Sequence, residues 1–326
     1  MNRVRQLMDG VLDATVVPGY SRIGYEIRSR SSDWESLPAG MASGRVMVVT
    51  GATSGLGSAT ARRLRRLGAT LVLVGRDRER TEAARESLLE EIPGPAPVDV
   101  VLADMAEPSQ VRDAARSLAS LPRLDVLVHN AGALSKQRVV NSGGLESTLA
   151  SQVVGPFIMT TMLSDVLARD RARVVTVSSG GMYAASLPDM GVDEPAPLRP
   201  GGYDGTRQYA TAKRMQVTLN EMWAAHSPSV HFAAMHPGWA DTPGVRSSLP
   251  GFARVTGPFL RDAEQGADTI VWLGATELAN LGASGGFWSD RSRRPIHRLG
   301  STRSSDDPQR RRALWEWCER EATRVP

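Results

Sequence analysis

The feature that most restricts the possible folds is a glycine-rich turn between a short apolar run and a helical pattern. Residues 46–50 read VMVVT, residues 51–57 read GATSGLG, and residues 58–67 have the spacing of a helix. An apolar run of this length is typical of a strand that is buried on both faces. Glycines allow a tight turn and a close approach of the backbone to a bound group. The arrangement therefore predicts a strand, a turn and a helix, with a ligand held at the turn.

The same alternation continues along the chain. Further strands are expected at 70–75, 98–102, 124–129, 173–178, 230–235 and 286–289. Helices are expected at 78–92, 108–121, 145–169, 206–226 and 263–274. Strands that alternate with helices of this length predict an α/β fold, a doubly wound parallel sheet of the Rossmann type with right-handed crossovers. Ligands of such a fold bind at the carboxyl ends of the strands.

We expect one domain over residues 45–290, flanked by two further segments. Residues 1–44 lack strong periodicity, which predicts an extension with at most one short helix. Residues 291–326 are expected to form a basic tail, in which residues 308–323 could form a helix capped by Asp306 or Asp307. Residues 186–204 are rich in Pro, Gly and Asp and interrupt the pattern as an insert.

Composition excludes several classes of protein. The single cysteine, Cys318, excludes an intrachain disulfide and fits a reducing compartment, so a cytoplasmic protein is expected. Asp9 and Asp13 interrupt the only mildly apolar stretch near the amino terminus, which argues against a signal peptide. No window has the length of a membrane span, although peripheral contact with a membrane stays open. Five scattered histidines predict no metal site.

The net charge of +4 is too modest to predict nucleic-acid binding, because arginines and acids are interspersed over most of the chain. Only the tail, with Arg291, Arg293, Arg294 and residues 310–312, leaves that alternative open. We interpret the tail as a solvated surface.

Tyr209 and Lys213 are the strongest candidates for chemistry. They lie four residues apart in a predicted helix, so both side chains point to one face, one turn apart. A nearby ammonium is expected to lower the pKa of the phenol, which suits it for proton transfer. The chain has 39 Lys and Arg residues, yet only Lys136 and Lys213 are lysines. Lysine therefore stands where a compact point charge is needed.

The glycine-rich turn, preceded by Thr50, resembles the cofactor loop of the classical short-chain dehydrogenases/reductases. Further stretches resemble the same family over roughly residues 40–290. Asn130, Ala131 and Gly132 follow the fourth strand, with His129 where the family has a first Asn. The resemblance implies an oxidoreductase that uses NAD(P) and acts on the CH–OH or C=O group of a small molecule. It also implies homo-oligomers paired through two long helices, although the insert or the tail could block this pairing.

The resemblance assigns the cofactor to the glycine-rich turn and to the segments after the second, third, fourth and sixth strands. The implied cofactor-binding residues are Gly51, Thr53, Ser54, Gly55, Leu56, Gly57, Arg76, Asp104, Met105, Asn130, Ala131, Gly132, Tyr209, Lys213, Pro237, Gly238 and Thr242. An acid at the position of Arg76 would accept from a ribose 2′-hydroxyl, whereas an arginine suits a 2′-phosphate. We therefore expect NADP, with NAD as the less favoured alternative.

The catalytic residues that the resemblance implies are Ser179, Tyr209, Lys213 and Gln152. Tyr209 would donate a proton in reduction and accept one in oxidation, Lys213 would also hold the nicotinamide ribose, and Ser179 would orient the reacting oxygen. Gln152 stands where the family usually has an Asn that anchors a water relay. The interval between Ser179 and Tyr209 is longer than usual in the family because it contains the insert.

Apolar residues in the segments that should border the cofactor suggest a lipophilic substrate, unless they only pack those loops. They are Met182, Tyr183, Trp239, Val245, Leu249, Phe252, Phe259 and Leu260. The alternative function is that of a non-catalytic NADP-binding sensor or scaffold, which Gln152 and the long insert favour.

Overall fold

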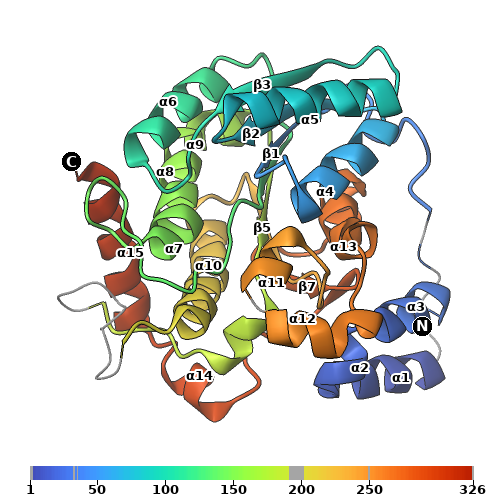
Figure 1. Ribbon diagram of the computed structural model, residues 1–326, viewed down its shortest axis with the longest axis vertical. Coiled ribbons are helices and arrows are strands. Elements are labelled where there is room, and N and C mark those ends of the chain that lie inside the picture. Colours follow the sequence, from blue (N-terminus) through green and yellow to red (C-terminus); the bar gives the residue numbers. More distant parts are fainter. Residues whose placement is uncertain (1–2, 32–33, 35, 191–201, 249, 325–326) are drawn as a thin grey trace.

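The computed structural model describes residues 3–31, 34, 36–190, 202–248 and 250–324. Within them an eight-stranded sheet has the order β3-β2-β1-β4-β5-β6-β7-β8, in which β1 to β7 are parallel and β8 is antiparallel to β7 (Figure 1). The strands are β1 (Val46–Thr50), β2 (Thr70–Gly75), β3 (Val98–Leu102), β4 (Val126–His129), β5 (Arg173–Val177), β6 (His231–Met235), β7 (Gly286–Ser289) and β8 (Ser292–Arg293). The predicted doubly wound parallel sheet is confirmed.

Helices cover both faces of the sheet (Figure 1). One face carries α4 (Gly55–Arg66), α5 (Arg78–Glu91) and α13 (Ala263–Ala275). The other carries α6 (Pro108–Ala119), α7 (Ser147–Leu149), α8 (Gly155–Met162), α9 (Ser164–Arg169), α10 (Gly205–His226) and α15 (Pro308–Thr323). The strand order reverses between β1 and β4, and the turn after β1 therefore opens at the point where such sheets bind ligands.

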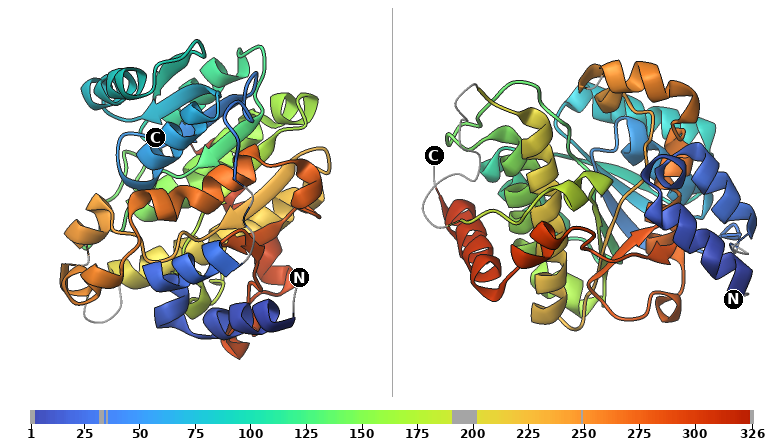
Figure 2. Two further views of the ribbon diagram at one scale, coloured as in Figure 1. Left: turned by 90° about the vertical axis from the view of Figure 1, so that its right-hand side faces the viewer. Right: turned by 90° about the horizontal axis from the view of Figure 1, so that it is seen from below.

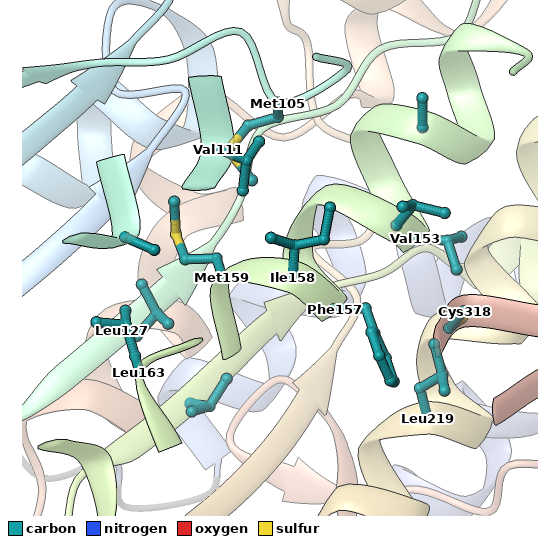
Figure 3. Packing of buried hydrophobic residues seen from close by; sticks show 14 of the residues in the cluster. Met105, Val111, Leu127, Val153, Phe157, Ile158, Met159, Leu163, Leu219 and Cys318 are labelled. Atoms are coloured by element: carbon teal, nitrogen blue, oxygen red, sulfur yellow. The ribbon is translucent and has the colours of Figure 1, made fainter. Parts of the chain in front are cut away.

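Apolar side chains fill the layer between the sheet and the second set of helices. Figure 3 shows Phe157 of α8 close to Leu219 of α10 and Cys318 of α15. Full burial of a side chain such as Phe157 contributes about 1.5–3 kcal/mol. Asp307 accepts hydrogen bonds from the amides of Gln309 and Arg310 and so caps α15, as predicted. The terminal helix is thus part of the core.

The helix expected at 145–169 is not continuous. It consists of α7, the π-helical turn η1 (Ala150–Val154), α8 and α9. Pro156 has no N–H and cannot donate to the carbonyl of Gln152, four residues earlier. The side chain of Gln216 in α10 donates to that carbonyl instead, at 2.7 Å. A π-helical turn of this kind often marks a functional position.

The amino-terminal segment holds three helices where at most one was expected. They are α1 (Arg3–Ala14), α2 (Val16–Tyr20) and α3 (Arg22–Ser31). The inner sides of these helices are polar, because Asp9 pairs with Arg28 and Arg294 at 2.8 and 2.7 Å. Val4, Leu7, Met8, Val11 and Leu12 do have helical spacing, but this spacing does not show that Leu7, Met8 and Val11 face outward. The three helices lie at the end of the molecule that also carries α12 (Pro250–Thr256) and α14 (Gly300–Ser304) (Figures 1 and 2).

Four shorter elements complete the described chain: η2 (Gly180–Ala184), α11 (Pro243–Ser248), η3 (Gly257–Phe259) and η4 (Leu278–Asn280). Arginines of the predicted basic tail are engaged in ion pairs, such as Arg291 with Asp268 at 2.7 Å and Arg311 with Asp306 at 2.7 Å. None of the described helices is long and apolar enough to cross a membrane. Residues 191–201 of the predicted insert lie outside the described residues.

Candidate active site

The glycine-rich turn is shaped by close backbone contacts. Gly51 has φ +69°, and a Cβ at Gly57 would lie 2.2 Å from the carbonyl oxygen of Gly51. Side chains at these positions would be excluded or strained. The side-chain amide of Asn130, after β4, donates to the carbonyl of Thr50 at 2.9 Å and so ties the turn to the next strand.

The first turn of α4 is free to receive an anion. Ser54 precedes this helix without a side-chain cap, whereas Asp77, Asp204 and Asp262 cap α5, α10 and α13. The amides and the positive end of the α4 dipole therefore stay available to a phosphate group. Thr242 lies against the turn, since a Cβ at Gly55 would be 3.4 Å from the Cβ of Thr242. These residues fit the pyrophosphate of a dinucleotide.

Charged side chains of both signs lie where β2 and β3 end. Arg76 is exposed and lies 3.8 Å from a carboxylate oxygen of Asp104. A cavity of about 320 Å³ between α4, β2 and α5 is lined by Thr53 and Arg80, among others. The sequence analysis missed Arg80, although the alternating charges of residues 76–80 could have pointed to it. Arg80 beside Thr53, together with the exposed Arg76 after β2, fits a ribose 2′-phosphate. Met105, after Asp104, is buried.

The two serines after β5 have different roles. Ser178 is buried, and its hydroxyl donates to the carbonyl of Lys213 at 2.9 Å. The hydroxyl of Ser179 accepts from the amide of Gly181 at 3.2 Å and lies near enough to Tyr209 to lower the pKa of its phenol. Ser179, the predicted member of the pair, is thus the serine that faces Tyr209.

Tyr209 and Lys213 lie together on α10, as predicted. The ammonium of Lys213 is 5.1 Å from the centre of the Tyr209 ring and donates to the carbonyl of Val177 at 2.8 Å. Burial raises the pKa of Tyr209 to about 12, although the nearby hydroxyl of Ser179 acts to lower it. Burial also lowers the pKa of Lys213 to about 7. The expected lowering of the phenol pKa by Lys213 is therefore wrong for the protein alone, because desolvation dominates both groups.

Gln152 is buried in η1, beneath Gly132. Its side-chain amide donates to the carbonyl of Ala133 at 2.8 Å, and a Cβ at Gly132 would lie 2.8 Å from its Cδ. A cavity of about 30 Å³ beside it is lined by His129, Gln216 and Asn220, among others. The side-chain oxygens of Gln152, Gln216 and Asn220 have no hydrogen-bond partner among the described residues. A cavity of this size and polarity can hold a water molecule.

The segment after β6 rests on the amino-terminal helices. Gly238 has φ +74°, and a Cβ there would lie 2.6 Å from the carbonyl of Tyr20, which accepts from the amide of Trp239 at 2.8 Å. The Tyr20 ring also lies against Gly180, next to Ser179. Arg261 donates to the carbonyl of Pro237 at 3.2 Å. The sequence analysis missed Tyr20 and Arg261, because neither lies in a recognisable motif.

The apolar residues predicted to border the site separate into two groups. Met182 and Tyr183 pack in a core cluster with Tyr20 and Phe287, so they are not open to a ligand. Phe259 is 47% exposed. Leu249 and the side chain of Phe252 lie outside the described residues. Among the described residues, no cluster of His, Cys, Asp or Glu could hold a metal ion.

This sheet, with its glycine-rich turn and its Ser, Tyr and Lys side chains, is the architecture of a dinucleotide-dependent oxidoreductase. The chain belongs to the short-chain dehydrogenase/reductase family, whose short chain dehydrogenase pattern matches residues 45–186. Dehydrogenase/reductase SDR family member 12 of Bos taurus is 39% identical over 306 residues, 94% of each chain.

Two further proteins extend the comparison. A Streptomyces protein named as a candidate daunorubicin C-13 ketoreductase is 34% identical over 260 residues, 79% of this chain and 88% of that one. L-Sorbose reductase from Gluconobacter frateurii, solved with NADPH and L-sorbose, superposes with a TM-score of 0.61 at 21% identity. That superposition covers 76% of this chain and 94% of the reductase. The chain is accordingly an oxidoreductase of the dehydrogenase/reductase type.

Proposed function

We propose that the protein transfers hydride between NADP(H) and a carbonyl or alcohol group of a lipophilic small molecule, with Tyr209 as the acid or base. One observation carries this proposal. The side chain of Ser179, just after the carboxyl end of β5, interacts with the phenol of Tyr209, and Lys213 lies one helical turn away on α10. Two hydroxyls that meet beside a buried cation can bind and protonate one oxygen atom.

The roles of the side chains follow from the charge that develops during reduction. Bound nicotinamide would supply the hydride. Negative charge then grows on the carbonyl oxygen, where Ser179 donates a hydrogen bond and Tyr209 gives up its proton. A phenol with a pKa of about 12 is protonated at neutral pH, which is the form that reduction requires. In oxidation Tyr209 would accept the proton from the alcohol.

Lys213 and Gln152 would support the proton transfer by Tyr209 without contacting the substrate. The ammonium of Lys213 uses one donor on Val177, and its remaining donors suit ribose hydroxyls. An anion of the cofactor near Lys213 would favour its charged form, which in turn lowers the pKa of Tyr209. Gln152 would anchor a water behind Lys213 through its side-chain oxygen. Asn130 would hold the glycine-rich turn in place for the cofactor.

Preference for NADP over NAD is supported by Arg80 beside Thr53 and by the exposed Arg76 after β2. The uncapped start of α4 supports binding of the pyrophosphate by the amides of Gly55, Leu56 and Gly57. By their family positions, Asp104 and Met105 would border the adenine. The ribose and nicotinamide would be bordered by Ala131, Gly132, Pro237, Gly238 and Thr242. Solved relatives bound to NADP or NADPH are in keeping with this preference.

A lipophilic substrate is supported by the apolar character of the segment after β6, which carries Trp239 and Phe259. The ketone that the Streptomyces relative is named for supports a carbonyl of this class. We further propose a cytoplasmic location, in keeping with the single buried thiol of Cys318.

Oxidation of NADPH and NADH with a panel of lipophilic ketones and aldehydes tests the proposal. Tyr209→Phe should lower kcat by about 10²- to 10⁴-fold while NADPH still binds. Tyr203→Phe is the matched control, because its hydroxyl bonds to Glu146 at 2.9 Å, outside the site. Tight NADPH binding without turnover by the wild type would favour the alternative, a sensor or scaffold that has kept the fold.

A further inference from the structure

The helix α1 is amphipathic, but its carboxylates face the protein and most of its apolar side chains face outward. Its carboxylates point inward, where Asp9 pairs with Arg28 and Arg294 and Asp13 pairs with Arg298 at 2.6 Å. Three of its apolar side chains point outward, with Leu7 71%, Met8 41% and Val11 56% exposed, whereas Leu12 is buried. A helix in contact with water places its polar face outside. The outer face of α1 is therefore built for an apolar environment.

The apolar surface continues onto the next two helices. Twelve large hydrophobic residues are exposed in the described chain, and six of them lie within α1 to α3. We call these six residues the N-terminal apolar surface: Leu7, Met8, Val11, Val16, Val17 and Ile23. Such a concentration in one short segment marks an interaction site rather than ordinary surface variation.

The charges beside this surface are mainly positive. Arg22 and Arg30 of α3 are exposed, with Glu26 between them at 3.6 Å from each. The other two carboxylates of the three helices, Asp9 and Asp13, are turned inward and paired with arginines. An apolar surface with exposed arginines at its side is complementary to a membrane whose headgroups are anionic.

We propose that the N-terminal apolar surface binds the surface of an anionic lipid bilayer, with α1 lying along the interface. The six residues are aliphatic and include no Trp or Tyr, the residues that usually anchor protein partners. The helices lie at the periphery of the molecule (Figure 2), where a flat membrane can reach them. Because Tyr20 at the end of α2 touches Gly180, docking brings the candidate active site close to the lipid. The surface itself is independent of the proposed catalysis.

Vesicle co-sedimentation of the full-length protein tests the proposal. Vesicles of phosphatidylcholine alone are compared with vesicles of phosphatidylcholine and phosphatidylglycerol in equal parts, at low and high salt. The wild type should sediment with the anionic vesicles, and less so at high salt. The double variant Leu7→Ser/Val11→Ser should bind anionic vesicles at least about tenfold more weakly, because two inserted aliphatic side chains are lost. Both residues are exposed, so the thermal unfolding curve should stay unchanged.

The matched control is Met162→Ser/Leu278→Ser, which removes two exposed apolar side chains of α8 and η4, 37% and 44% exposed. It should bind anionic vesicles as the wild type does. Wild-type protein that stays in the supernatant with anionic vesicles would overturn the proposal, as would equal binding by both double variants. A wild-type dimer in light scattering that becomes a monomer in Leu7→Ser/Val11→Ser would assign the surface to a second copy of the chain instead.

Discussion

The substitution Asp290→Asn should weaken the ion pairs that attach the amino-terminal helices to the rest of the fold. Asp290 is 2% exposed and accepts from Arg261 at 2.6 and 2.9 Å and from Arg28 at 2.7 Å. Burial alone would raise its pKa, but the guanidinium groups of Arg261 and Arg28 hold the pKa below its ordinary value. The residue is thus a buried anion between two buried cations.

Asparagine is the informative replacement because it keeps the size and shape of the side chain, while it removes the charge and replaces one of the two acceptor oxygens with an NH2 donor. Asp290 has φ +51°, a left-handed conformation that Asn adopts more readily than Ala. The change leaves Arg261 and Arg28 buried without their shared carboxylate. Breaking a buried ion pair from one side costs about 3–5 kcal/mol. We therefore expect the free energy of unfolding to fall by that amount and the melting temperature by roughly 5–10 °C.

Urea unfolding, followed by circular dichroism, measures this loss. The control is Asp113→Asn, whose carboxylate is 73% exposed and pairs with Arg116 on the surface of α6, and which should unfold almost as the wild type does. In the double variant Arg28→Met/Asp290→Asn the two losses should not add, because both residues serve one network. If Asp290→Asn unfolds at the same urea concentration as Asp113→Asn, the ion pairs of Asp290 do not stabilise the packing of the amino-terminal helices.

The remaining predictions concern pH, the serines and the cofactor. Burial lowers the pKa of His129 from 6.5 to about 3, so only the unfolded chain takes up this proton between those values. Its contribution to stability is complete above pH 6.5 and falls by about 1.4 kcal/mol per pH unit below it. The slope measured by urea unfolding should be smaller by this amount in His129→Asn, while His231 and His236, whose pKa values are also lowered, keep their own contributions. Ser179→Ala should lower kcat/KM by about 10²-fold or more, whereas Ser178→Ala should mainly lower the free energy of unfolding, by about 1 kcal/mol. Equal losses of kcat/KM in the two variants would contradict the choice of Ser179 as the catalytic serine. Arg76→Glu should weaken NADPH binding about 10- to 100-fold in fluorescence titration and leave NADH binding nearly unchanged, and a parallel loss of both would argue against a 2′-phosphate contact.

The sheet and the turn could be predicted because their signals are local. Runs such as residues 46–50 and 70–75 are mainly apolar, and the glycines after β1 form a recognisable motif, although Gly51 and Gly55 meet the distant residues Ala131 and Thr242 in the fold. The cap of α15 by Asp307 is likewise a local pattern. The proximity of Tyr209 and Lys213 followed from helical spacing alone.

The features that could not be predicted depend on contacts between distant residues. The three amino-terminal helices are held by pairs such as Arg28 with Asp290, which are 262 positions apart. The pKa of Tyr209 is set by how deeply the folded chain surrounds it, and spacing to Lys213 carries no information on that. The break in the long helix was different, since Pro156 was visible in the sequence and its missing N–H was the cause.

Transfer of deuterium from NADPH deuterated at C4 of the nicotinamide tests the central claim most directly. The acceptor is the carbonyl of the panel that gives the fastest turnover, and mass spectrometry follows the alcohol formed. We expect the wild type to place one deuterium on the former carbonyl carbon, and Tyr209→Phe to bind the cofactor without forming this product. Wild-type protein that binds NADPH but transfers no deuterium to any carbonyl of the panel would contradict the proposed catalysis.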